Sequence, residues 1–207
     1  MKNSAIGSNW KDVRSEIFSK EELIEKFSLE RVQRSGARFD EKRLLWMNGQ
    51  WIRRLSLDDL YSRVEHYWPA SAASADESYK KQVLALVQDR LKTLAELPML
   101  SRYFFEEPTI NEELITTNKP LRKLTDEQRR ELLATAHAAL AQQHTWTPSA
   151  IQDTLNQLLE TTGHKPGVLF SLIRIATTWA PFSPQLNDTL ALLGKERTLA
   201  RIEQYLG

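Results

Sequence analysis

Apolar residues recur along most of the chain at intervals of three, four and seven positions, which is the spacing of one face of an α-helix. Leu23, Ile24 and Phe27, for example, share a face in this way. The spacing predicts helices whose apolar residues span positions 20–27, 41–54, 57–68, 83–97, 132–140, 151–159, 168–176, 186–193 and 199–206. We find no convincing strand pattern and no repeat of fixed period.

Helix boundaries are marked by residues with known preferences for helix ends. Side chains that can cap a helix N-terminus stand at Ser19, Asp40, Ser56, Thr125, Thr147 and Ser183. Three of them are followed three residues later by an acid or an amide, as in a capping box, and two are followed directly by proline. The residues expected to end helices are Pro69, Pro98, Gly163 and Gly194.

Composition supports the same fold class. The chain has only 7 glycines in 207 residues, which is about half the usual share of roughly 7%. Leu, Ala, Glu, Gln, Lys and Arg, the best helix formers, are abundant. We therefore predict an all-α protein of about nine or ten helices. Its breaks are expected near residues 54–56 and within 105–124, with a hinge of small residues at 70–78.

Charge and cysteine content exclude several classes of protein. Lys and Arg number 28 and Asp and Glu 27, for a net charge of +1, which excludes a uniformly basic nucleic-acid-binding surface but allows a local one. The absence of cysteine excludes disulfides, thiolate chemistry and cysteine zinc sites. No run approaches the ~18 apolar residues of a membrane span, and the N-terminus lacks a signal-peptide core. We expect a cytoplasmic protein with no membrane association.

No pattern in the sequence indicates catalysis. The glycines form neither a dinucleotide-binding nor a P-loop motif, and no serine lies in a nucleophile elbow. His137 and His144 are seven residues apart, yet no carboxylate completes a metal-ligand set. The adjacent Glu106 and Glu107 do not face each other as an acid and a base. We expect no catalytic residue, no metal and no cofactor.

Residues 31–54 carry most of the local charge asymmetry. They hold seven basic and two acidic residues, a local net charge of +5, and Trp46 and Trp51 lie among them. Arginine with tryptophan suits phosphate contact and base stacking. The alternative interpretation is a core-facing aromatic pair with a solvated basic rim. Composition alone slightly favours the second.

The order of several segments resembles bacterial glutamyl-tRNA synthetases just after their catalytic core. The resemblance begins with EIFSKEELIEKFSLERV and FDEKRLLWMNGQWIRRLSLDDL in residues 16–60, and continues with RLKTLAELP, RYFF, LIRIATTWAPFSPQL and LALLGKERTLARI at 90–98, 102–105, 172–186 and 190–202. It covers about residues 12–207, in the family's order and approximate spacing. The nucleotide-binding signatures of a class I synthetase are missing from the chain.

The resemblance implies the tRNA-recognition half of such a ligase, with no catalysis of its own. It implies a small helical stem-contact segment at 12–55, followed by two packed helical anticodon-binding subdomains at 56–105 and 106–207. Residues 1–11 match poorly and are interpreted as a tag or an alternative start. The implied partners are tRNA(Glu) and a separate chain that supplies the catalytic half, and we expect a monomer. The alternative function is a helical interaction or structural domain that has lost RNA binding.

The resemblance also assigns anticodon contacts. Arg90 matches the arginine that meets the third anticodon base and helps to exclude glutamine-type tRNA, and Arg174 matches the arginine at the first base. An arginine fork is suited to this role because it can pair with two acceptors on a base edge. The loop around the splayed bases is matched by Ser183, Pro184 and Leu186. Alternatively, Arg90 forms an ion pair with Glu96 or Asp89, and Ser183 with Pro184 simply starts a helix.

Three residues of the stem-contact segment, Arg43, Trp46 and Arg53, match positions near tRNA. For Trp46 we favour a place in the core, because a tryptophan in an apolar helical stripe is usually buried. The chain departs from the family at Trp179, where a Thr-Gly pair is usual. A bulky residue fits poorly at a tight turn, so the local backbone and the first-base pocket are not expected to match those of the family in full. Alternatively, Trp179 supplies a new stacking platform.

Overall fold

The computed structural model describes residues 17–32, 36 and 39–207, and in this part of the chain all regular structure is helical. The all-α prediction is confirmed. The described residues form eleven α-helices rather than nine or ten: α1 (Lys20–Lys26), α2 (Glu41–Arg54), α3 (Leu57–Arg63), α4 (Glu77–Val87), α5 (Leu97–Ser101), α6 (Glu113–Thr116), α7 (Asp126–Ala141), α8 (Pro148–Thr162), α9 (Pro166–Thr178), α10 (Leu186–Leu193) and α11 (Lys195–Leu206). Residues 1–11, interpreted above as a tag or an alternative start, lie outside the described residues.

Most predicted helix ends are confirmed by hydrogen bonds. Ser19 and Thr125 form capping boxes with the residues three positions later. The side chains of Asp40, Ser56 and Thr147 accept hydrogen bonds from backbone N–H groups of the first turns of α2, α3 and α8. Gly163 closes α8 with φ +68°, a left-handed conformation that favours glycine. Local sequence therefore sets these boundaries without help from distant contacts.

The prediction of one helix over residues 83–97 is wrong. Helix α4 ends at Val87 and is followed by 3₁₀ turns at Gln88–Arg90 and Leu94–Glu96. The Glu96 carboxylate accepts hydrogen bonds from the backbone N–H groups of Lys92 and Thr93, which fixes the turn between them. Pro98 lies in the first turn of α5 instead of ending a helix. The apolar period continued through the segment because its leucines are buried in the same core, although they belong to separate elements.

Two other predicted segments, the helix at 57–68 and the hinge at 70–78, are shorter in the structure. Helix α3 ends at Arg63, and a 3₁₀ turn at Glu65–Tyr67 completes the segment before Pro69. The hinge of small residues contains a 3₁₀ turn at Ala70–Ala72 and ends at Asp76, whose side chain caps α4. In the first segment, the tighter hydrogen bonds of a 3₁₀ turn replace the last predicted helical turn. In the second, the Asp76 cap starts α4 before the predicted end of the hinge at residue 78.

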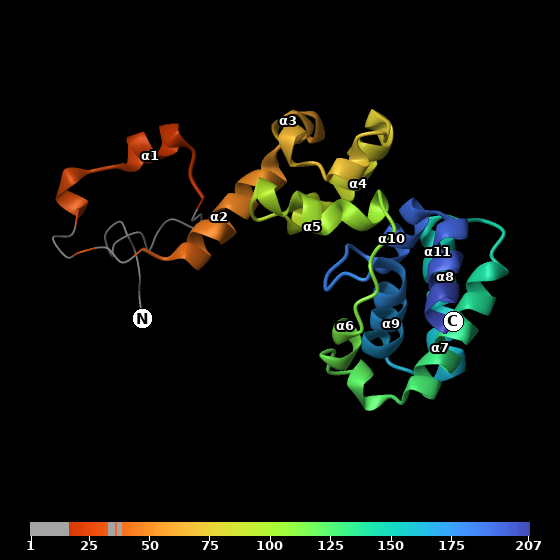
Figure 1. The fold of residues 1–207 in the computed structure, drawn as a ribbon. Coiled ribbons are helices and arrows are strands. Elements are labelled where there is room, and N and C mark those ends of the chain that lie inside the picture. The colour runs from red at the N-terminus through yellow and green to blue at the C-terminus, as the bar shows by residue number, and fades with distance from the viewer. Residues whose placement is uncertain (1–16, 33–35, 37–38) are drawn as a thin grey trace.

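The helices form two packed groups that share one core. Helices α3, α4 and α5 pack together and continue from α2, while α7, α8, α9, α10 and α11 pack as a bundle. Contacts between α4 and α10 join the groups. Figure 1 shows the first group above, with the bundle below it and to the right. The core extends from Leu60 and Leu84 in the first group to Leu133 and Leu155 in the second.

Candidate nucleic-acid interface

Arg90 acts electrostatically on Arg174, from which it is 84 positions away in the sequence. Arg90 lies exposed at the end of the turn after α4, and Arg174 lies half-buried on α9. Burial and the charge of Arg90 both lower the pKa of the Arg174 guanidinium. Two like charges within reach of each other are costly unless an anion or a polar acceptor is bound between them. Sequence reasoning named both residues, but not their proximity.

Arg90 is held in place by contacts between its turn and α2. The Gln88 side chain donates to the backbone carbonyls of Ile52 and Leu55, at 3.0 Å each. Arg53 Nε donates to the backbone carbonyl of Asp89 at 2.9 Å. Gly49 allows α2 to approach closely, because a Cβ there would lie 3.2 Å from the carbonyl oxygen of Leu91. The segment that carries Arg90 is therefore fixed on both sides of the arginine.

The alternative interpretation of Arg90, an ion pair with Glu96 or Asp89, does not fit the structure. Within the described residues Arg90 has no acidic partner, and the Glu96 carboxylate is occupied by backbone N–H groups. Its guanidinium is thus available at the surface.

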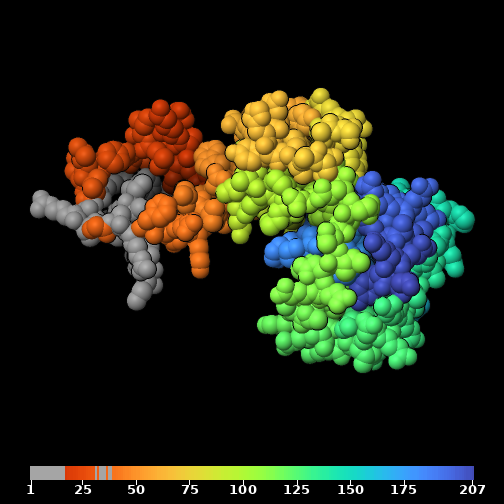
Figure 2. All heavy atoms as spheres, viewed as in Figure 1, coloured from red at the N-terminus to blue at the C-terminus, as the bar shows by residue number. Residues whose placement is uncertain are grey.

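Arg174 is positioned by the loop that follows α9. Arg174 Nε donates to Ser183 Oγ at 2.7 Å, and Ser183 Oγ in turn donates to the Pro184 carbonyl at 3.1 Å. Ser183, Pro184 and Leu186 are all buried, so the loop is packed rather than free. In Figures 1 and 2 this loop, in lighter blue, extends from the bundle beneath α5.

The interpretation of Ser183 as a helix cap is wrong. Helix α10 begins two residues after Pro184, at Leu186, and its N-cap residue is Gln185, whose side chain makes no capping hydrogen bond. The Ser183 hydroxyl is engaged with the arginine instead.

Tyr103 is the residue that sequence reasoning missed. It lies in the 3₁₀ turn Arg102–Phe104, is 3% exposed, and its hydroxyl has no hydrogen-bond partner in the part of the chain that the structure describes. Burial raises the pKa of this hydroxyl, while the charges of Arg90 and Arg174 act in the opposite direction. The tyrosine thus belongs to the same cluster as both arginines. In the sequence, the only indication of this region was the RYFF segment at 102–105, which resembles the family but assigned no role to the Tyr103 side chain.

Helix α2 presents a second basic surface. Arg43 and Arg53 are exposed on it, and the guanidinium of Arg54 lies 5.0 Å from the centre of the Trp51 ring. The expectation that Trp46 is buried in the core is wrong, because it is 43% exposed. Only Gly49 and Ile52 of this helix are buried, since it packs through a narrow strip. Of the remaining basic residues of the segment, Arg34 and Arg38 lie outside the described residues.

A family model described as an anticodon binding domain matches residues 59–206. The chain belongs to the anticodon-binding domain family. The match includes Arg90, Tyr103, Arg174 and the loop around Ser183.

Curated glutamate–tRNA ligases are similar in sequence to this chain over most of its length. Glutamate–tRNA ligase of Roseiflexus sp. (strain RS-1) is 39% identical over 198 residues, which cover 93% of this chain and 38% of the ligase. The ligase of Thermus thermophilus is 37% identical over 193 residues, covering 92% of the chain and 40% of the ligase. The chain therefore spans about two fifths of these relatives, in their C-terminal part. The resemblance to this family is confirmed.

Solved structures show the same fold. A glutamate–tRNA ligase from Elizabethkingia meningosepticum superposes with a TM-score of 0.72 at 20% identity, over 93% of this chain and 37% of that one. The enzyme from Elizabethkingia anophelis gives 0.71 with the same identity and coverage. The likeness extends beyond the residues matched by the family model.

Trp179 has a structural place in the anticodon-binding domain. It ends α9 with φ +43°, and within the described residues it is the only residue other than glycine with positive φ. Its ring is buried and stacks on Tyr205 of α11, with the ring centres 5.8 Å apart. The alternative of a stacking platform for a base does not fit this burial. The loop that carries Ser183 continues directly from this turn.

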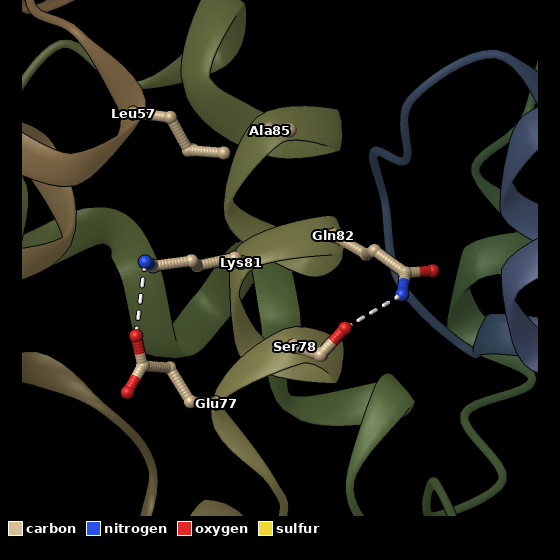
Figure 3. Close-up of a pocket in the computed structure, with 6 residues that line it drawn as sticks. All are labelled: Leu57, Glu77, Ser78, Lys81, Gln82 and Ala85. Carbon is tan, nitrogen blue, oxygen red and sulfur yellow. Dashed lines mark hydrogen bonds and ion pairs between the residues drawn. The ribbon is translucent and has the colours of Figure 1, made fainter.

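The hollow drawn in Figure 3 lies between α3 and α4, apart from the arginine cluster. Its volume is about 550 Å³ and it is lined by Leu57, Glu77, Ser78, Lys81, Gln82 and Ala85. Lys81 pairs with Asp58 at 2.7 Å and with Glu77 at 2.9 Å, so its charge is neutralised within the protein. None of the predicted site residues lines this hollow.

Metal-binding and membrane-spanning features are absent from the residues with described placement. These residues contain no group of three or more His, Cys, Asp or Glu arranged to hold a metal ion. None of their helices has the length and apolar content needed to cross a bilayer.

Proposed function

We propose that this anticodon-binding domain recognises the anticodon loop of tRNA(Glu). The observation that carries the proposal is the cluster of Arg90 and Arg174 beside the packed turn at Ser183. Two guanidinium groups without a carboxylate partner in the described residues suit the acceptor atoms of single-stranded bases and phosphates. Membership of the family and the names of the relatives support tRNA as the ligand. Because the chain spans only part of those ligases, tRNA(Glu) as its ligand is part of the proposal.

We assign roles to the residues on the same basis. Arg90 meets the third anticodon base and Arg174 the first, with Ser183, Pro184 and Leu186 shaping the pocket of the first base. A buried, hydrogen-bonded loop is suited to this role because its geometry is set before the RNA arrives. On α2, the exposed Arg43, Trp46 and Arg53 contact the tRNA stem and its phosphates. These contacts supply affinity rather than base selection.

The chain is further proposed to act without ligase chemistry of its own. These 207 residues encode no phosphate-binding loop and no class I signature, so they do not include the residues that would activate glutamate with ATP. We propose a cytoplasmic monomer that binds tRNA. Absence of ATP–pyrophosphate exchange in the purified chain is the expected result.

The experiment compares two arginine variants on two tRNAs. Fluorescence anisotropy would measure the binding of Arg90→Gln and Arg174→Ala to tRNA(Glu) and tRNA(Gln) transcripts over a salt series. Arg90→Gln is expected to reduce the preference for tRNA(Glu) by roughly 1–3 kcal/mol, since a bidentate base contact is lost. Arg174→Ala is expected to weaken both complexes, because the first-base pocket serves either tRNA.

A matched control is Arg63→Gln on α3. This arginine pairs with Asp59 at 3.0 Å, as an exposed arginine outside the cluster. Its replacement should leave both affinities nearly unchanged. Equal loss on both tRNAs for Arg90→Gln would make Arg90 a phosphate contact and refute its role in discrimination. Lack of wild-type binding at any salt concentration would favour the interaction-domain alternative.

A further inference from the structure

The Gln50 side chain of α2 lies between two hydrogen-bond donors. Its amide oxygen accepts from Trp46 Nε1 at 3.2 Å and from Arg53 Nη1 at 3.0 Å. The oxygen faces both groups because an indole N–H and a guanidinium can only donate. The three residues are spaced by four and three positions, so they follow one face of the helix. One side chain therefore holds an aromatic ring and a positive charge next to each other.

The Arg53 guanidinium is fixed from a second direction. Its Nε donates to the backbone carbonyl of Asp89, the residue directly before Arg90, at 2.9 Å. Its Nη1 lies 3.7 Å from the point that a Cβ at Gly49 would occupy, so the guanidinium lies back along α2. This face of α2 is therefore attached to the turn that carries Arg90.

The surface that this face offers to a ligand combines apolar and charged groups. Trp46 is 43% exposed, and its one polar group, the indole N–H, is already bonded to Gln50. Its exposed surface is therefore apolar ring. Arg53 is exposed as well, and among the described residues only its Nε and Nη1 are bonded, which leaves Nη2 to donate to a ligand.

A second tryptophan and arginine of the same helix are arranged differently. Trp51 is 39% exposed, but the Arg54 guanidinium lies 5.0 Å from its ring centre. This distance is typical of a cation–π contact, in which the guanidinium covers one face of the ring. Trp51 and Arg54 thus satisfy each other, and they provide a comparison of nearly equal exposure for Trp46 and Arg53.

We propose that Gln50 is a positioning residue that holds the Trp46 ring and the Arg53 guanidinium together against the sugar–phosphate backbone of a tRNA stem. The inference rests on the proposed function, which takes Trp46 and Arg53 to contact the stem. In a paired stem the bases are stacked inside, and riboses and phosphates form much of the accessible surface. The ring packs on a ribose, and the guanidinium donates to a phosphate of the same strand. Because no base is read, the contact acts alike on tRNAs of different anticodon.

The test measures the binding of Gln50→Met to tRNA(Glu) and tRNA(Gln) transcripts by fluorescence anisotropy. Methionine keeps the length of the side chain and removes the acceptor oxygen. Affinity is expected to fall roughly five-fold, by the same factor on both tRNAs. The melting temperature should change little, because Gln50 is only half-buried.

The matched control is Gln82→Met on α4. This exposed glutamine donates to Ser78 of its own helix at 3.4 Å, and its replacement should leave both affinities unchanged. A loss for Gln50→Met that is below two-fold, or no larger than that of Gln82→Met, overturns the inference. Unequal losses on the two tRNAs also overturn it, because they indicate a base contact.

A mutant cycle separates positioning from direct contact. In a chain that carries Trp46→Leu and Arg53→Gln, Gln50→Met should cause no further loss, since the groups that it positions are gone. The same loss in both backgrounds would mean that Gln50 contacts the RNA itself, and the positioning role would be wrong.

Two arginine variants test the phosphate contact. Arg53→Gln and Arg54→Gln remove the same charge from neighbouring positions. Arg53→Gln should lower the slope of log affinity against log salt concentration by about one, and Arg54→Gln should leave it nearly unchanged. Equal slopes would mean that α2 acts through its charge alone, which contradicts the inference.

Failure of the inference can be distinguished from failure of the proposed function. A wild-type chain that binds neither tRNA refutes the proposed function itself. Binding that depends on Arg90 and Arg174, but not on Gln50, refutes only this inference.

Discussion

At the scale of single residues, Trp179 combines two opposing contributions. A non-glycine residue in the left-handed region is disfavoured because its Cβ approaches backbone atoms. The buried indole, stacked on Tyr205, offsets this cost by contact with α11. The sequence comparison identified the unusual residue at this turn but could not show that its ring faces the protein.

The two contributions can be separated with a pair of variants. Trp179→Ala and Trp179→Gly both remove the ring, and each is expected to lower the free energy of unfolding by about 3 kcal/mol, as for other buried aromatic truncations. The glycine variant should be the more stable of the two by about 1 kcal/mol, because φ +43° costs it no steric strain. Urea unfolding measures both, and an alanine variant as stable as the glycine variant would contradict the strained turn.

Residues of the candidate site were predictable to the extent that each carries a local sequence signal. Arg90, Arg174 and Ser183 were found because they lie in segments that resemble a known family. No role could be assigned to Tyr103 from the sequence, because its burial and the charges near its hydroxyl are set by segments distant in sequence. Trp46 was misplaced for a similar reason, since nothing in its helix indicates how narrow the packed strip is.

At the scale of secondary-structure elements, hydrogen bonds between neighbours in sequence explain what was predictable. Capping side chains at Ser19, Asp40, Ser56, Thr125 and Thr147 act over three residues, so the sequence contains all the necessary information. The break after α4 is different. It is stabilised by side chains that reach α2, such as Gln88, and apolar periodicity carries no record of such contacts.

The cap of α7 provides a test at this scale. Thr125→Ala removes the hydroxyl that accepts from the backbone N–H of Gln128 at 3.2 Å, and should lower the free energy of unfolding by about 1 kcal/mol. Thr135→Ala on the exposed side of the same helix is the control and should be neutral or slightly stabilising, because alanine favours helix. Thermal or urea unfolding compares the two. Equal losses for both variants would mean that the capping box does not stabilise α7.

At the scale of the whole molecule, Arg201 joins the segment after α5 to the bundle. Its guanidinium binds the carbonyls of Tyr103, Glu106 and Thr177, together with the Glu107 carboxylate. A buried charge of this kind needs a partner in the folded state. The hydrogen bond from Arg201 lowers the pKa of Glu107 below its usual value, and burial of the carboxylate opposes this only in part.

This pair predicts a dependence of stability on pH. Since folding lowers the pKa of Glu107, its contribution is complete above the unfolded value of about 4.3 and is lost as pH falls through the lower folded value. Glu107→Gln is expected to be less stable than wild type by about 1 kcal/mol at pH 7, a modest value because the carboxylate is mostly exposed. The difference should shrink between pH 5 and about pH 3. Urea unfolding at several pH values checks this, and a constant difference would contradict it.

Under the proposed function, the fixed placement of Arg90 and Arg174 has a consequence for the kinetics of RNA binding. Gln88 and Arg53 hold one arginine, Ser183 holds the other, and Arg201 joins the surrounding segments before any ligand arrives. The RNA is then the partner that has to rearrange, by unstacking its loop. A step of this kind slows association equally for correct and incorrect tRNAs, so discrimination between them should appear in their dissociation rates.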